Sequence, residues 1–302
     1  MLIVANPVSG KGRGARTAER LAGILGDGGV DVEIAYTSAS GDARRIAEEQ
    51  LAADARKHDC FVACGGDGTI QEVAHVLATA KEGGGPGPIP ALGLAPSGRC
   101  NDFARELGVG TDPVDQAEIL LSGRRVSLDL GKVNDRYFCT VVTAGIDAEI
   151  SRFVDRMKLP LRGRIAYVYG ALRVLARYRA PRVHIEADFG VVDGPIFLAS
   201  SANTASYGGA IPIAPGASPT DGLLHVCVID ALPRLAALRL VPAVLAGRHP
   251  KRAGVRVAPT RALDITSDPP LELWADGEPI AHTPARIEAV PDAIEVMLPD
   301  NA

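Results

Sequence analysis

The sequence predicts a two-domain protein, with an N-terminal α/β domain built on a parallel sheet and a C-terminal β-sandwich domain. Through about residue 120, short apolar runs alternate with stretches of helical periodicity, as in successive βαβ units. Farther along, apolar and polar residues alternate with period two, and turn residues recur roughly every 8 to 12 positions. The length of 302 residues also exceeds what a single hydrophobic core usually contains.

In the first domain, strands and helices are expected to alternate. Strands are expected at 1–7, 30–37, 60–64 and 89–96, and helices at 15–25, 40–57 and 69–80. In parallel sheets, ligands bind beyond the carboxyl ends of the strands. This rule selects three loops as candidate sites, at 6–14, 65–69 and 96–101.

In the second domain, most of the chain is expected to be extended. Strands are predicted within 124–150, with a turn at Asn134-Asp135, and within 182–203, 222–230, 255–267, 271–280 and 285–299. Two segments with helical periodicity, 162–178 and 232–245, interrupt this pattern. Together these segments predict a sandwich or barrel with two inserted helices.

Composition and charge narrow the class of protein. No apolar stretch approaches the roughly 18 residues that cross a bilayer, and the opening MLIVANPVSG lacks the basic start of a signal peptide. The five cysteines have no zinc-binding spacing, which favours reduced thiols in a cytoplasmic protein. The net charge of −4 and the lack of a basic, aromatic-rich groove signature argue against nucleic-acid binding.

Positive charge is concentrated in one segment. Between Arg152 and Arg182 the chain has nine arginines and lysines and one acidic residue, Asp155. The helix expected at 162–178 could place arginines and tyrosines against anionic lipid headgroups. It could equally be a helix packed on the sandwich with solvated arginines, and the pattern alone leaves both interpretations open.

The three candidate loops share a chemistry suited to phosphate. Ser9 to Gly12 offers a hydroxyl, unhindered backbone N–H groups and a lysine at a helix N-terminus. Asp67, between Gly66 and Gly68, would repel phosphate unless a cation such as Mg²⁺ lay beside it or it accepted a hydroxyl proton. Taken alone, each loop could be only a tight turn, and neither standard nucleotide-binding glycine fingerprint is present.

Six blocks, in order along nearly the whole chain, resemble the bacterial diacylglycerol kinase family of lipid kinases, which is related to sphingosine and ceramide kinases. They are NPVSGKG, GGDGTIQEV, PSGRCNDFARELG, AGIDAEI, YGGAIPIAPGASPTDGLLHVCVID and WADGEPI. The resemblance implies a nucleotide-binding domain like that of phosphofructokinases and NAD kinases at 1–128, completed by 286–302. It implies a β-sandwich domain for the lipid substrate at 129–285, with ATP in the cleft between the domains.

The resemblance also implies an ATP- and Mg²⁺-dependent transfer of the γ-phosphate to a lipid hydroxyl such as that of diacylglycerol. In this scheme Glu278 is the general base and Asp67 lies at the metal-bound nucleotide. A structural Mg²⁺ would bind Ser218, Asp221 and Leu223, although SPTDG also fits a plain β-turn. Glu278 could likewise be an exposed residue after a hairpin turn. The residues matching the ATP site are Asn6, Pro7, Val8, Ser9, Gly10, Thr37, Gly65, Gly66, Asp67, Gly68, Thr69, Ile70, Gln71, Arg99 and Asn101.

Three positions depart from the family pattern. Arg99 stands where a nucleotide-contacting threonine is usual, Cys100 stands where glycine or alanine is usual, and Gln71 replaces a usual asparagine. A guanidinium can hold phosphate in two hydrogen bonds, or it can fill the space of the nucleoside. One alternative is therefore a catalytically altered homologue that binds lipid or nucleotide. A soluble-substrate kinase of the NAD kinase type is a second alternative, because the GGDGT loop alone does not exclude it.

For a lipid kinase, the expected partner is a lipid at the inner membrane surface. We expect a cytoplasmic protein with peripheral membrane association, with contact through Arg162–Tyr178 and without a transmembrane segment. Whether the chain forms a homodimer is left open by the sequence.

Overall fold

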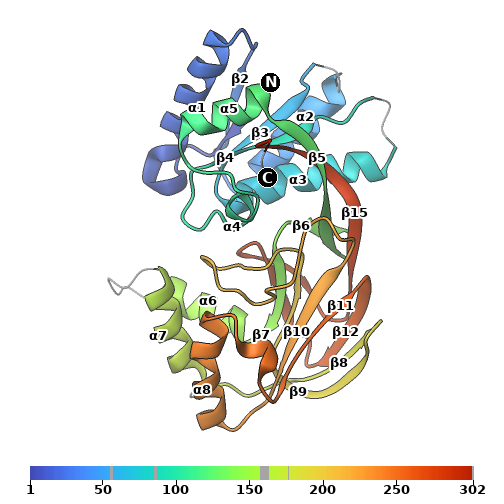
Figure 1. Ribbon diagram of the computed structural model, residues 1–302. Helices are drawn as coiled ribbons and strands as arrows, with labels where there is room; N and C mark the ends of the chain where they lie inside the picture. Colours follow the sequence, from blue (N-terminus) through green and yellow to red (C-terminus); the bar gives the residue numbers. More distant parts are fainter. Residues whose placement is uncertain (55–56, 85–86, 157–162, 176, 301–302) are drawn as a thin grey trace. The chain divides into compact units, whose positions relative to one another are not determined.

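The computed structural model describes residues 1–54, 57–84, 87–156, 163–175 and 177–300 (Figure 1). The chain forms two compact units. Unit 1 comprises Met1–Leu130 and Pro291–Ala302, and unit 2 comprises Gly131–Val290. Each unit has its own sheet and its own core.

The sheet of unit 1 is parallel, as predicted. Its strands lie in the order β15-β4-β3-β1-β2, and Val296 near the end of β15 pairs in parallel with Leu92 of β4. The strands β1 and β3 are buried along their whole length, which explains their continuous apolar sequence. The bounds are β1 Leu2–Ala5, β2 Glu33–Tyr36, β3 Cys60–Gly65, β4 Ala91–Pro96 and β15 Ala285–Leu298.

The helices of unit 1 cover this sheet. Ala18, Leu21 and Leu25 of α1 are fully buried and join residues of α5 in one core cluster with the sheet. The helices α2 and α3 pack against each other, and α3 also packs on β3 and β4. The bounds are α1 Ser9–Asp27, α2 Asp42–Asp54, α3 Asp67–Glu82, α4 Asp102–Glu106 and α5 Pro113–Ser122. The sequence analysis did not predict α4 and α5.

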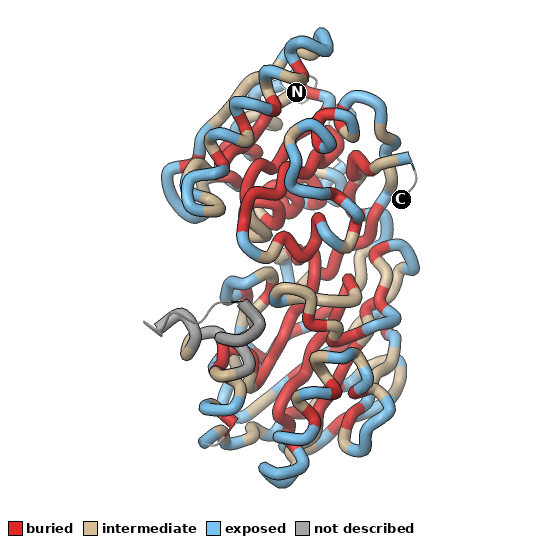
Figure 2. Tube along the Cα trace, turned by 60° about the vertical axis from the view of Figure 1, so that its left-hand side comes forward, coloured by how far each residue is buried: buried red, intermediate tan, exposed pale blue. Residues whose placement is uncertain are grey.

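Unit 2 is the predicted β-sandwich domain. Its strands follow the order β14-β13-β7-β9-β8-β12-β15, β10 pairs with β9 and β11, and β5 pairs with β15 and β6. Buried residues follow the strands of this unit (Figure 2). The bounds are β5 Arg124–Val133, β6 Arg136–Phe138, β7 Val141–Gly145, β8 Arg182–Ala187, β9 Gly190–Ala202, β10 Leu224–Asp230, β11 Val255–Thr260, β12 Ala262–Asp268, β13 Glu272–Ala275 and β14 Glu278–His282.

Among the described residues of unit 2, three helices and one short 3₁₀ turn complete the unit. They are α6 Ile146–Arg156, α7 Gly163–Leu175, α8 Arg234–Leu245 and the turn η1 His249–Lys251. The predicted strand through residue 150 is wrong, because the chain turns helical directly after Gly145, whose φ of 109° suits glycine. The sequence IDAEI alternates with period two, but Ile146 and Ile150 are also one helical turn apart.

Part of the predicted basic helix lies outside the described residues. Within 162–178, Arg162 and Ala176 are not described, and the helix α7 covers 163–175. In the described parts of the chain, no helix is both long enough and apolar enough to cross a bilayer.

Candidate functional site

The three loops selected from the sequence meet at the carboxyl ends of β1, β3 and β4 in unit 1. The backbone N–H of Asn6 donates to the Cys64 carbonyl at 2.8 Å, and that of Ser97 donates to the Gly65 carbonyl at 2.8 Å. These bonds continue the parallel ladder past the ends of the strands. The loops at 6–14, 65–69 and 96–101 are therefore held side by side.

Glycine is required where these loops touch. A Cβ on Gly98 would lie 2.5 Å from the Gly66 Cα, and a Cβ on Gly10 would lie 2.0 Å from the Ser97 carbonyl oxygen. Gly10 also has a φ of 56°, in the left-handed region. The glycines thus allow three backbones to approach one another more closely than any side chain permits.

Arg13 links the first loop to the third, a role that the sequence analysis missed. Its Nη2 donates to the carbonyl oxygens of Ser97 at 3.2 Å and Gly98 at 3.1 Å, and its Nε donates to the Gly10 carbonyl at 3.2 Å. The only sequence signal was a cation within the glycine-rich turn SGKGRG. Arg13 therefore holds the shape of the site from the side of α1.

Asp67 begins α3 and is half-buried. Burial raises the pKa of its carboxyl group, while the backbone N–H groups of Phe103 and Asn101 oppose that shift. The Phe103 N–H donates to Asp67 Oδ1 at 3.4 Å, which ties the second loop to the start of α4. Its place at a helix N-terminus further favours the charged form.

The third loop contains buried polar atoms that lack partners. Ser97 Oγ and Asn101 Oδ1 are buried and have no hydrogen-bond partner among the described residues. Asn101 has a left-handed φ of 50°, and its Nδ2 donates to the Gly98 carbonyl at 3.3 Å. Leaving such atoms unpaired costs free energy, so a polar ligand that supplied their partners would be bound favourably.

The other predicted residues of unit 1 have different surroundings. Asn6 Oδ1 accepts from the Val8 N–H at 3.2 Å, which shapes the first loop, and the Thr37 N–H donates to the Ala5 carbonyl at 2.8 Å. Ile70 and Gln71 are buried in α3. Arg99 is exposed within the third loop. Arg105, in α4, forms an ion pair with Asp102 and donates to the Cys100 carbonyl at 2.6 Å.

Glu278 belongs to unit 2 and is exposed at the start of β14. The preceding turn has left-handed φ values at Asp276 and Gly277, as its Asp-Gly sequence predicts. The Asp276 carboxylate accepts from the backbone N–H of Cys139 at 2.7 Å, from the backbone N–H of Thr140 at 2.9 Å and from the Thr140 hydroxyl. Asp276, which the sequence analysis did not select, thus positions the turn that carries Glu278.

The predicted metal residues Ser218, Asp221 and Leu223 lie in a turn of unit 2. Asp221 Oδ1 accepts from the Leu223 N–H at 3.0 Å, and Oδ2 lies 3.5 Å from His225 Nε2. Over the described residues, no cluster of three or more His, Cys, Asp or Glu side chains could hold a metal ion. Any cation here would therefore depend on one carboxylate and on backbone oxygens.

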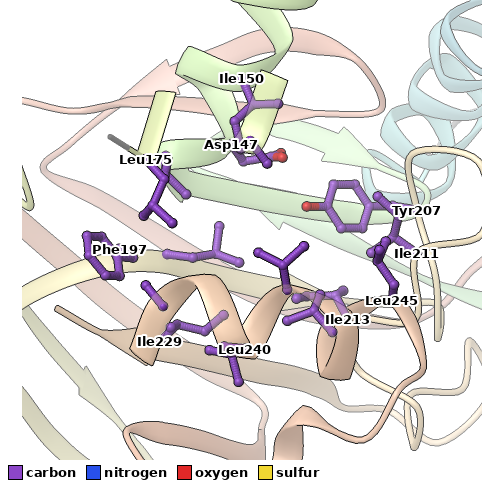
Figure 3. A pocket seen from close by; sticks show the side chains of 16 residues that line it. Asp147, Ile150, Leu175, Phe197, Tyr207, Ile211, Ile213, Ile229, Leu240 and Leu245 are labelled. Atoms are coloured by element: carbon purple, nitrogen blue, oxygen red, sulfur yellow. The ribbon is translucent and has the colours of Figure 1, made fainter. Parts of the chain in front are cut away.

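A cavity of about 120 Å³ lies in unit 2 among α6, α7, α8, β9 and β10 (Figure 3). Its walls are apolar except for the Asp147 carboxylate and the Tyr207 hydroxyl. Figure 3 shows Asp147 on α6 and the Tyr207 ring beside Ile211, with its hydroxyl pointing into the cavity. The lining residues are Ile146, Asp147, Ile150, Ala171, Leu175, Phe197, Leu198, Tyr207, Ile211, Ile213, Ile229, Ala237, Leu240, Val241, Val244 and Leu245. Such a cavity suits an apolar chain that carries a hydrogen-bonding group.

Asp147 is the polar feature of this cavity. Burial raises the pKa of its carboxyl group to about 6, although hydrogen bonding by Thr143 and the nearby Tyr207 hydroxyl opposes the shift. Thr143 Oγ1 donates to Asp147 Oδ2 at 2.9 Å, whereas Oδ1 is buried without a partner in bonding geometry among the described residues. One carboxylate oxygen is thus left for a donor group.

Comparisons with known proteins agree with both units. Residues 1–133 match the diacylglycerol kinase catalytic domain, and residues 140–298 match the YegS C-terminal domain, described as an NAD kinase β-sandwich-like domain. The chain therefore belongs to the diacylglycerol kinase family of lipid kinases. As a member of that family, it is a phosphotransferase that uses an alcohol group as acceptor.

Individual relatives cover almost the whole chain. A diacylglycerol kinase of Mycobacterium tuberculosis is 33% identical, over 98% of this chain and 94% of the relative. A YegS-like lipid kinase of Yersinia enterocolitica is 31% identical, over 97% and 96%. The crystal structure of a diacylglycerol kinase from Bacillus anthracis has a TM-score of 0.78 and 25% identity, over 98% and 96% of the two chains.

Proposed function

We propose that this protein transfers the γ-phosphate of ATP to the hydroxyl of a membrane lipid, with diacylglycerol as the first candidate acceptor. The observation that carries the proposal is the apolar cavity of unit 2 with its single buried carboxylate, in a chain that also contains a glycine-lined polar site. A soluble acceptor such as NAD has little use for apolar walls, whereas an acyl chain does.

Unit 1 supplies the nucleotide end of the proposed site, within a functional domain at 1–128 and 286–302. The loops at 6–10 and 65–69 would hold the phosphates through backbone N–H groups, while Arg99 and Asn101 would add side-chain contacts. The unpaired Ser97 Oγ and Asn101 Oδ1 and the close approach at Gly66 and Gly98 fit a polar ligand at this place. A bound Mg²⁺ would neutralise phosphate charge, and Asp67 is the carboxylate that would face it.

Unit 2 supplies the acceptor end, within a functional domain at 129–285. Glu278 would accept the proton of the acceptor hydroxyl, and Asp276 would hold the turn in place through its bonds to residues 139 and 140. The lipid chain would occupy the cavity, where Asp147 would accept a hydrogen bond from a polar group near the glycerol.

The segment Ser218–Leu223 is a secondary part of the proposal. We assign it a structural Mg²⁺ held by the Asp221 carboxylate and by backbone oxygens of Ser218 and Leu223. The Leu223 N–H bond to Asp221 Oδ1 would remain, so Oδ2 is the oxygen available to the ion. Loss of this ion would lower stability and leave the chemical step intact.

Because the acceptor is a lipid, the protein would act at the inner membrane surface as a peripheral protein of the cytoplasm. Arg173 and Arg177, in the described part of the basic segment, are exposed and available to anionic headgroups. Residue 162, also part of the expected contact, lies outside the described residues.

The test is transfer of label from γ-labelled ATP, with Mg²⁺, to a panel of lipids that includes diacylglycerols and sphingoid bases. We expect labelled lipid with the wild type and a decrease of roughly 10²–10⁴-fold in kcat with Glu278→Gln, the range for loss of a general base. Asp67→Asn should lower activity similarly. Folded wild-type protein that labels no lipid would refute the proposal.

A further inference from the structure

The outer face of α8 has no part in the proposed reaction, and it combines leucines with arginines. The inner side of this helix is committed, since Ala237 and Leu240 are buried and line the cavity. On the outer side, Leu235 and Leu238 have 61% and 43% of their surface exposed. These leucines are three residues apart and share a face. We define the outer face of α8 as Arg234, Leu235, Leu238 and Arg239.

The sequence around α8 is rich in positive charge. From Ala231 to Leu263 the sequence contains seven arginines and lysines and no aspartate or glutamate, although the whole chain has a net charge of −4. Arg234 and Arg239 are exposed and form no ion pair with any residue in the described ranges. Their charge is therefore available to an anionic partner rather than used within the fold.

The neighbouring helix has the same character. The helix α7 packs beside α8 (Figure 1), and its residues Leu172 and Arg173 are also exposed. Exposed leucines flanked by arginines are typical of helices that lie at a membrane surface, where apolar side chains enter the acyl boundary and arginines reach the phosphates.

We propose that the outer face of α8 binds the surface of an anionic phospholipid bilayer. Leu235 and Leu238 enter the acyl boundary, and Arg234 and Arg239 contact lipid phosphates. Binding of this face to a bilayer does not itself require kinase activity. Its role does rest on the proposed function, because such binding would bring the cavity behind α8 to the lipid that fills it. A second copy of this chain is the other possible occupant of this face, and the test below distinguishes the two.

The test is co-sedimentation of the full chain with phosphatidylcholine vesicles that contain about 40% phosphatidylglycerol, in comparison with pure phosphatidylcholine. We expect binding to the anionic vesicles that weakens as salt rises from about 0.1 to 0.5 M. The double variant Arg234→Gln/Arg239→Gln should bind the anionic vesicles roughly tenfold or more weakly, because each arginine contributes about fivefold. Its binding should also depend less on salt concentration than that of the wild type. Leu235→Gln/Leu238→Gln should weaken binding by roughly tenfold at either salt concentration.

Matched controls separate this surface from general effects. Val191→Gln replaces a side chain of unit 2 that is 60% exposed on β9, and Arg16→Gln/Arg20→Gln removes the same charge from α1. Both controls should bind vesicles as the wild type does. The proposal fails if the wild type ignores anionic vesicles, if the α8 variants bind normally, or if the controls lose as much binding. It also fails if sedimentation shows that the α8 changes break a dimer instead.

A second measurement separates this proposal from the proposed function. A short-chain diacylglycerol in solution needs no bilayer, so the α8 variants should phosphorylate it at the wild-type rate and lose activity only on vesicles. Wild type that labels no lipid of the panel, in solution or in vesicles, but whose vesicle binding depends on α8, would refute the kinase proposal and support the docking surface. Equal losses on soluble and vesicle lipid would refute the docking surface.

Discussion

Asp147 places a carboxyl group in a cavity wall that is otherwise nearly all apolar. Thr143 satisfies one of its oxygens, and burial disfavours the charged form. The sequence motif AGIDAEI contains this residue but gives no sign of its burial, because the cavity is built from segments up to about a hundred residues away. Asp67 was easier to select, since it stands out within a glycine turn, whereas Glu278 was selected from the family resemblance.

Asp147 makes stability depend on pH. Its pKa is raised from 3.8 to about 6 in the folded protein, so the folded state binds this proton more tightly than the unfolded chain. The contribution of Asp147 to the free energy of unfolding is fully present below pH 3.8 and is lost as the pH rises through about 6. The unfolding free energy should decrease by about 3 kcal/mol over this range. Asp147→Asn cannot ionise, so its unfolding free energy in urea should lack this decline.

The control for this experiment is Asp135→Asn, which changes an exposed aspartate in the turn between β5 and β6. Its stability should decline with pH as in the wild type. If Asp147→Asn declined in parallel with the wild type over the same pH range, Asp147 would not be the group responsible.

At the scale of elements, the contact between the second and third loops depends on Gly98. A methyl group there would lie 2.5 Å from the Gly66 Cα and 2.8 Å from Asn101 Oδ1. Relieving the first contact would require the backbone at Gly66 or Gly98 to move. Gly98→Ala should therefore spread the proposed nucleotide site and raise the KM for ATP by roughly tenfold or more. Gly110→Ala, where a Cβ meets no atom within 4 Å, should leave that KM unchanged. Equal KM values in the two variants would contradict the role of this contact.

The turn that carries Glu278 depends on Asp276. Asp276→Ala removes the acceptor for the backbone N–H groups of Cys139 and Thr140, which should cost about 2–3 kcal/mol in unfolding free energy. It should also lower kcat, because the turn loses its support. Glu278→Gln, at an exposed position, should lower kcat with no change in stability. If Asp276→Ala kept the wild-type kcat and stability, the turn would not depend on the hydrogen bonds of Asp276.

Patterns of local sequence predicted the elements that have one dominant signal. The buried strands β1, β3 and β4 and the helices α1, α2, α3 and α8 were predicted from periodicity. The helix α6 was not, because IDAEI satisfies both periods over so few residues. The helix α5 had a usable signal in Asp112-Pro113, whose Asp112 Oδ1 accepts from the Val114 N–H at 2.9 Å.

At the scale of the whole molecule, the order of the elements was enough to predict the fold class. An alternation of strands and helices followed by a run of strands predicted a parallel sheet and a sandwich, and both are present. Both boundaries between the compact units fall inside strands, β5 and β15. The cavity was not predicted, because its apolar lining residues differ from ordinary core residues only in where the folded chain places them.

Whether this chain phosphorylates a lipid rather than a soluble alcohol can be decided in one competition assay. The protein would be given γ-labelled ATP and Mg²⁺ with diacylglycerol and NAD together in one mixture. We expect label in the lipid, little or none in NAD, and loss of the lipid label with Glu278→Gln. Label in NAD without label in the lipid, or lipid label that persists in Glu278→Gln at the wild-type rate, would contradict this expectation.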